Sequence, residues 1–285
     1  MTSTSTDSED GGRSMSTEVI GGLDPTNVVI SICVIAALLI AGQIFRALDG
    51  LGILAAGILG VVVGVMGHWS WLAILLVFLG TSHIATKWGW EQKKELGMCE
   101  SKDGGRGWIN VAANGMLPGL VALFAFALQE WTLFYWLFVA AVAVAAADTW
   151  ASEFGCLDPR VRLIRNGMMV PPGTNGGTSI MGQWAALGGS ALISFVALVV
   201  GWVPATGNMS ELGFFGAMAA GDWNGGMILA LITTIIGWLG CQMDSILGAH
   251  YENRGLMTKN QVNAASIAMG VVVMAILVLT LPLLP

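Results

Sequence analysis

Eight long apolar runs constrain this chain more than any other feature. A helix needs about 20 mainly apolar residues to cross the hydrocarbon core of a bilayer. Only 11% of the residues are charged, whereas soluble domains carry about 25%. The pattern therefore predicts an all-α, polytopic transmembrane bundle of about eight helices, with six to nine possible. The runs lie near residues 27–46, 50–67, 69–86, 108–128, 131–151, 182–203, 223–244 and 262–283.

The basic residues predict how these helices are oriented. The chain has 12 lysine and arginine residues, and all but Arg13 fall in alternate loops. The positive-inside rule places such loops in the cytoplasm, which leaves both termini external. We therefore expect a multi-pass protein of the cell (plasma) membrane. The residues in the alternate loops are Arg46, Lys87, Lys93, Lys94, Lys102, Arg106, Arg160, Arg162, Arg165, Arg254 and Lys259.

The N-terminal segment differs in composition from the rest of the chain. It is polar and acidic, and it lacks the basic start and apolar core of a signal peptide. Such a composition is typical of disorder. We expect a disordered polar external tail at residues 1–26 and a transmembrane domain, with a cytoplasmic-facing active site, at residues 27–285.

Three acidic residues lie at the ends of apolar runs. Asp148 and Glu153 belong to AAADTWASEFG, and Asp244 belongs to CQMDSILGA. A carboxylate at membrane depth costs about 2.5–3.5 kcal/mol, and the C-terminal end of a helix disfavours negative charge further. Bound Mg²⁺ would reverse both effects, because it prefers oxygen ligands. The three acids are therefore predicted metal ligands and catalytic residues, with pairing to loop arginines or exposure to water as the alternative.

A polar loop between the two acidic motifs contains three glycines in PPGTNGGTS. Glycine allows backbone amides to converge on an anion. The loop is not a Walker A motif, because it lacks the lysine and the strand–helix context. We predict that it binds phosphate together with arginines that precede it. The predicted residues are Gly173, Thr174, Asn175, Gly176, Gly177, Arg162 and Arg165.

Two further runs, 108–128 and 262–283, begin on the same predicted side as the acidic motifs. Helix N-termini attract anions, and basic or amide side chains accompany both starts. Simple helix capping is an equal alternative for Asn110 and Asn260. Asn114 lies deeper in its helix and is a predicted catalytic residue. The predicted phosphate-binding residues here are Arg106, Lys259 and Asn263.

Five segments resemble those of a known membrane family. RGWINVAANG, ADTWASEFG, VPPGTNGGTS, MDSILGA and NQVNAAS occur in this order. They are similar to the integral-membrane family of plant phytyl-phosphate kinase and eukaryotic transmembrane protein 19, over roughly residues 85–283. This chain lacks the glutamine usual near Asn110 and the longer insert that often follows the DS motif. The family's motif positions correspond to Asn114, Asp148, Glu153, Gly173, Thr174, Asn175, Gly176, Gly177, Asp244, Ser245 and Asn263.

The resemblance implies a kinase that converts a prenyl monophosphate to the diphosphate, with CTP as donor and one or two Mg²⁺ ions. Its partners would be the prenyl monophosphate, the nucleoside triphosphate and membrane lipids, and no nucleic acid. Such a transfer depends on positioning and charge neutralisation. Three other classes stay open: a lipid-phosphate cytidylyltransferase, a non-catalytic scaffold, and a transporter, whose ionisable groups would lie near the bilayer midplane.

Overall fold

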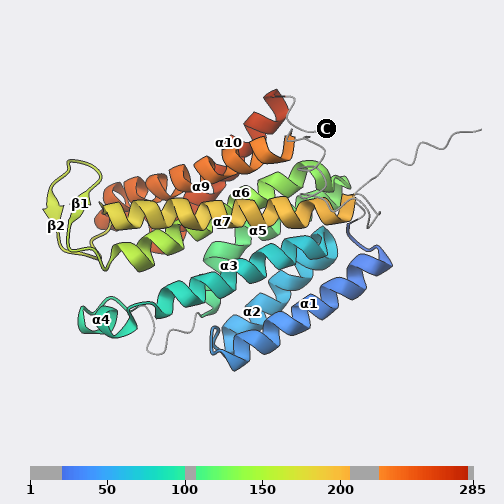
Figure 1. The fold of residues 1–285 in the computed structure, drawn as a ribbon, viewed down its shortest axis with the longest axis horizontal. Coiled ribbons are helices and arrows are strands. Elements are labelled where there is room, and N and C mark those ends of the chain that lie inside the picture. The colour runs from blue at the N-terminus through green and yellow to red at the C-terminus, as the bar shows by residue number, and fades with distance from the viewer. Residues whose placement is uncertain (1–20, 100–106, 206–224, 282–285) are drawn as a thin grey trace, which may run out of the picture.

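The computed structural model describes residues 21–99, 107–205 and 225–281, which form a bundle of long helices (Figure 1). Within these residues, 8 helices are long and apolar enough to cross a membrane. This confirms the predicted polytopic helical bundle and the predicted number of about eight candidate spans. The spans are built from α1 (Pro25–Ile44), α2 (Gly50–Gly60) with its π-helical continuation η1 (Val61–Gly67), α3 (Trp69–Lys87), α5 (Trp108–Leu128), α6 (Trp131–Gly155), α7 (Ile180–Ala205), α9 (Gly225–His250) and α10 (Lys259–Thr280).

Helix α6 lies at the centre of the bundle and packs against α3, α5, α7, α9 and α10. All its residues from 136 to 147 are buried, and most are alanine or valine. Small side chains allow membrane helices to approach closely. Gly240 of α9 and Gly270 of α10 show this, because a Cβ added at either position would lie 2.6 Å from Val144. The neighbouring helices therefore surround the segment of α6 that leads to Asp148.

The helices that carry the acids are longer than their apolar runs suggest. The sequence predicts ends near residues 151 and 244, but α6 continues to Gly155 and α9 to His250. At 1.5 Å per residue, Asp148 and Asp244 therefore lie roughly 10 Å inside the helix ends. The prediction that they stand at the ends is wrong. Polar residues end the apolar runs, but residues 151–155 and 244–250 contain no proline that would end the helical hydrogen bonding there.

The polar loop predicted between α6 and α7 contains short strands. Strand β1 (Val161–Leu163) pairs antiparallel with β2 (Met169–Val170) on one side and with β3 (Gly177–Thr178) on the other. This small sheet and the short helix α4 (Trp90–Glu95) lie beyond the same end of the bundle (Figure 1). We call this end, with α4 and β1–β3, the strand end.

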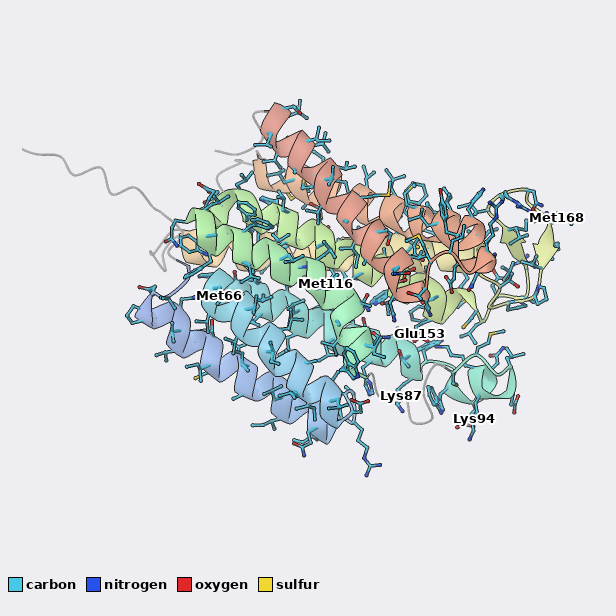
Figure 2. The ribbon with its side chains drawn as sticks, turned by 180° about the vertical axis from the view of Figure 1, so that it is seen from behind. Met66, Lys87, Lys94, Met116, Glu153 and Met168 are labelled. Atoms are coloured by element: carbon cyan, nitrogen blue, oxygen red, sulfur yellow. The ribbon has the colours of Figure 1, made fainter. Side chains whose placement is uncertain are left out.

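The two ends of the bundle differ in charge. Lys87, Lys94, Glu153 and Met168 lie toward the strand end, whereas Met66 lies toward the other end (Figure 2). Helix α1 begins and α10 ends at the end opposite the strands (Figure 1). The segments joining α1 to α2, α3 to α5, α6 to α7 and α9 to α10 therefore lie at the strand end, as the alternation of basic loops predicts. The predicted tail falls mainly on residues 1–20, outside the described residues.

Candidate functional site at the strand end

A polar cavity of about 580 Å³ opens between α6, α7 and α9 at the strand end. The loop at residues 96–99 and the glycine-rich loop complete its walls. We call it the strand-end cavity. It brings together predicted residues from Asp148 to Lys259, which are more than 100 positions apart in the sequence. Those that line it are Asp148, Glu153, Gly173, Thr174, Asn175, Gly176, Gly177, Asp244, Ser245 and Lys259.

Two of the predicted metal-binding acids meet in this cavity. The carboxyl groups of Asp148 on α6 and Asp244 on α9 interact with each other. Ser266 Oγ lies 3.2 Å from Asp244 Oδ2 and 2.9 Å from the backbone oxygen of Asn263, so its one hydroxyl proton is shared between these two acceptors. With its amide nitrogen turned toward Asp244, Asn263 donates to Asp244 Oδ2 at 3.2 Å. Lys259 is close enough to act on the charge of Asp244. Helix α10 thus orients the acid of α9, and Asp148 and Asp244 form a carboxylate pair.

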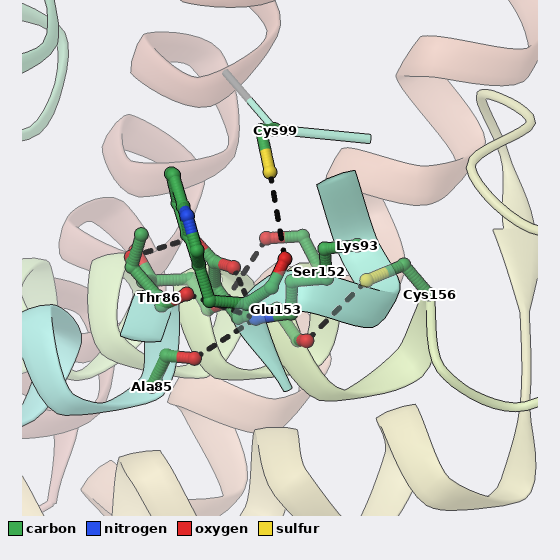
Figure 3. A network of polar contacts seen from close by, with 9 residues as sticks. Ala85, Thr86, Lys93, Cys99, Ser152, Glu153 and Cys156 are labelled. Atoms are coloured by element: carbon green, nitrogen blue, oxygen red, sulfur yellow. Dashed lines mark hydrogen bonds and ion pairs between the residues drawn. The ribbon is translucent and has the colours of Figure 1, made fainter. Parts of the chain in front are cut away.

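The third predicted metal-binding acid has a different set of partners. Glu153 Oε2 forms an ion pair with Lys93 Nζ at 2.8 Å, and Glu153 Oε1 accepts a hydrogen bond from Thr86 Oγ1 at 2.6 Å (Figure 3). Both carboxylate oxygens are therefore engaged by protein groups. Glu153 lines the same cavity as the carboxylate pair, but a lysine already balances its charge.

The glycine-rich loop is pressed against α9. Gly176 has φ +76°, and a Cβ there would lie 2.5 Å from Ala249 Cβ and 3.0 Å from the carbonyl oxygen of Ser245. A Cβ at Gly177 would lie 2.6 Å from Val161 and 2.8 Å from the carbonyl oxygen of Thr174. Only glycine fits this backbone path. The amides of Thr174 and Gly177 donate within the loop, which leaves those of Gly173, Asn175 and Gly176 as candidates for anion binding.

The start of α7 also borders the cavity, although its residues were not predicted to belong to the site. Ser179, Gly182 and Gln183 line the cavity. Ser179 Oγ accepts a hydrogen bond from Gly182 N at 3.1 Å, as the residue that caps a helix N-terminus does. The signal was present in the sequence, because Ser179 ends the polar loop and directly precedes an apolar run. Helix α7 thus presents its positive end to the cavity.

Gln183 is held in one orientation by the opposite helix. Its Oε1 accepts from Trp238 Nε1 at 2.9 Å, and its Nε2 donates to Gln242 Oε1 at 3.0 Å. Gln242 in turn donates to the carbonyl oxygen of Trp238 at 3.3 Å. Because an indole N–H only donates and a carbonyl oxygen only accepts, both amide orientations are defined. The amide of Gln183 thus joins α7 to α9 at the wall of the cavity.

Other predicted residues lie outside this cavity. Asn114 donates to the backbone oxygen of Asn110 at 3.0 Å, and both residues line a separate, mainly apolar cavity of about 70 Å³. Arg162 and Arg165 are exposed, and Arg162 donates to the carbonyl oxygen of Gly167 at 3.0 Å. Asn263 reaches the site through Asp244 rather than as a lining residue. Arg106 lies outside the described residues.

The reactivity of two cysteines can be used to measure access to the cavity. Cys99 and Cys156 both line it. Cys156 follows the end of α6, and burial raises the pKa of its thiol. Its Sγ donates to the carbonyl oxygen of Glu153 at 3.3 Å. Cys99 is half-buried. A reagent for thiols should therefore react at Cys99 in preference to Cys156, because the thiolate is the reactive form.

The donor groups of the cavity fit a divalent cation of the Mg²⁺ type. Among the described residues, no three His, Cys, Asp or Glu side chains lie close enough together to hold a metal ion by themselves. Mg²⁺ in phosphoryl-transfer sites typically uses one or two carboxylates, and substrate phosphates and water supply the other oxygens. The carboxylate pair of Asp148 and Asp244 matches that smaller requirement.

The bundle and its polar end cavity define an integral membrane protein of the polytopic helical class. The chain belongs to the family described as Integral membrane protein DUF92, which matches residues 33–276. The family assignment is consistent with the resemblance drawn from the motif segments.

Relatives of this chain are found in archaea, plants and cyanobacteria. The uncharacterized membrane protein MJ0933 of Methanocaldococcus jannaschii is 29% identical over 253 residues, or 88% of this chain and 94% of that protein. Protein PGR of Arabidopsis thaliana is 30% identical over 216 residues, 70% of each chain. The uncharacterized membrane protein sll0875 of Synechocystis is 25% identical over 210 residues, 73% of each chain. No solved structure matches the chain.

Proposed function

We propose that this protein is a membrane kinase that transfers a phosphoryl group from a nucleoside triphosphate, with CTP as the expected donor, to a prenyl monophosphate. One observation carries the proposal. The carboxylate pair, the glycine-rich loop and the N-terminal turn of α7 line one cavity. Carboxylates that hold a cation and backbone amides that hold an anion are the two parts that bind a metal–phosphate complex. The choice of CTP and of a prenyl acceptor follows from the motif resemblance.

Each group in the cavity has a role in this proposal. Asp148 and Asp244 would hold one or two Mg²⁺ ions, which neutralise charge on the donor phosphates when bound. Ser266 and Asn263 keep Asp244 oriented. The free amides of the glycine-rich loop bind phosphate oxygens of the donor. The geometry of this cavity gives no support to the roles predicted for Asn114, Arg162 and Arg165.

Lys259 is the proposed contact for the acceptor phosphate. It lines the cavity at the start of α10. The acceptor is already anionic and needs little activation by a base, so positioning and charge neutralisation dominate the reaction. The prenyl chain would lie between helices within the bilayer. The strand end would face the cytoplasm, because the basic loops gather there, and nucleotide would enter from that side.

Product analysis tests the proposed reaction. Purified protein with Mg²⁺ is offered CTP, ATP, GTP or UTP together with short-chain and long-chain prenyl monophosphates. We expect equal amounts of nucleoside diphosphate and prenyl diphosphate. Release of pyrophosphate with a nucleotide-linked lipid would instead identify a cytidylyltransferase. Uptake of substrate into vesicles without nucleotide consumption would identify a transporter.

A further inference from the structure

Lys93 is the most deeply buried charged side chain near the strand-end cavity. It belongs to the short helix α4, and its side chain is 2% exposed. Its Nζ donates to the carbonyl oxygens of Ala85 at 2.9 Å and Thr86 at 3.3 Å, and to Glu153 Oε2 at 2.8 Å (Figure 3). An ammonium group has three donors, and all three are used. Lys93 thus links the C-terminal turn of α3 to α6.

The partners of Lys93 explain how a charge is tolerated there. Carbonyl oxygens at the end of a helix carry partial negative charge, which favours a cation. Glu153 supplies a full negative charge and is itself held by Thr86. Removing one member of a buried ion pair leaves the other charge uncompensated, whereas replacing both with neutral groups is tolerated far better. The pair therefore behaves as a unit.

The loop that follows α4 forms a wall of the cavity. Met98 N donates to the carbonyl oxygen of Lys93 at 2.8 Å. The backbone of this loop is therefore hydrogen-bonded directly to the residue whose side chain is buried. Residues 96–99 then line the cavity. On the opposite side, the position of a Cβ at Gly173 lies 3.5 Å from Met98 Cε. The wall thus contacts the glycine-rich loop directly.

We infer that Lys93 and Glu153 form a positioning pair, which sets the wall at residues 96–99 against the glycine-rich loop. Glu153 acts through Lys93 and does not ligate the metal. The inference concerns the cavity of the proposed kinase and rests on that function. It separates the two acids of the DTWASE segment: Asp148 belongs to the carboxylate pair, and Glu153 shapes the opening through which nucleotide phosphates pass.

A double-mutant cycle in purified, detergent-solubilised protein tests the pair. Lys93→Met and Glu153→Gln should each raise KM for the nucleotide about 10-fold or more, with a smaller change in kcat, because each leaves a buried charge without its partner. The variant with both substitutions should recover most of the lost affinity. Lys94→Met, an exposed neighbour on the same helix, should behave as wild type. Thr86→Val should give a smaller loss, because it removes one hydrogen bond to Glu153.

Alkylation of Cys99 provides a readout that does not depend on activity. Without nucleotide, each single substitution should speed alkylation of Cys99, and the double variant should return toward the wild-type rate. The inference is overturned if the double variant is folded but as impaired as Glu153→Gln, since a metal ligand cannot be rescued by removing a lysine. An unchanged Cys99 rate in both single variants overturns it as well. Absence of turnover in wild-type protein, together with the expected Cys99 rates, would refute the kinase and leave the positioning pair.

Discussion

Replacing Asp148 or Asp244 with asparagine is expected to lower turnover by at least about 100-fold, because charge neutralisation dominates phosphoryl transfer. The two carboxyl groups interact within one cavity, so each substitution removes half of the proposed cation site. The measurement is the initial rate of prenyl diphosphate formation at saturating nucleotide and Mg²⁺. We expect the variants to fold, since neutralising one of two adjacent acids relieves repulsion between like charges.

An acid outside the cavity provides the matched control for these variants. Glu91 is exposed on α4, so Glu91→Gln should keep wild-type turnover. A loss of turnover in Glu91→Gln as well as in the aspartate variants would indicate a general effect of net charge. Turnover at the wild-type rate in either aspartate variant would remove that residue from the site.

Gly176→Ala is expected to raise KM for the nucleotide about 10-fold or more, since steric overlap and backbone strain of this kind cost roughly 1–3 kcal/mol each. The added methyl group would meet Ala249 at 2.5 Å while the backbone has φ +76°. Gly167→Ala is the matched control. Its φ is +70°, but a Cβ there has open space around it, and Gly167 does not line the cavity.

The effect at Gly176 should differ from that of the exposed arginines. Steric overlap does not depend on ionic strength, so added salt should leave the Gly176→Ala defect unchanged. Arg162→Ala and Arg165→Ala should give smaller losses of nucleotide affinity. Added salt should cause a similar loss in the wild-type protein, because salt screens exposed charges. Equal nucleotide affinity in Gly176→Ala and wild-type protein would show that GTNGG is an ordinary turn.

The sequence predicts the fold well because bilayer thickness sets a length that apolar runs reveal directly. It predicts helix ends less well. Residues 149–155 of α6 are more polar than the run before them, yet they stay helical, so hydropathy misplaces Asp148 at an end. The short strands were also missed, since pairing of two- and three-residue segments depends on the helices that bring them together.

The sequence predicts many of the residues that line the strand-end cavity, but it does not predict which side chains pair with one another there. Motif positions identified Asp148, Asp244 and the glycine-rich loop, and these residues line one cavity. The partner of Glu153 is 60 residues away in the sequence, and no local pattern reveals which acid a loop lysine reaches. Asn114 is the opposite case. It belongs to a motif segment and was predicted to join the same site, but it lines a different cavity. Tertiary packing decides both outcomes.

Cysteine alkylation tests the proposal that nucleotide phosphates bind in the strand-end cavity. Cys99 lines the cavity, and a cysteine introduced by Glu91→Cys, at an exposed position of α4 that does not line the cavity, serves as an internal control. At Mg²⁺–CTP about 100-fold above Kd, free sites fall to roughly 1%, so alkylation of Cys99 should slow by up to about 100-fold. The cysteine introduced by Glu91→Cys should react at an unchanged rate, and Gly176→Ala should shift the protection of Cys99 to higher nucleotide concentrations. An unchanged Cys99 rate at nucleotide concentrations that sustain turnover would contradict the assignment of this cavity as the nucleotide site.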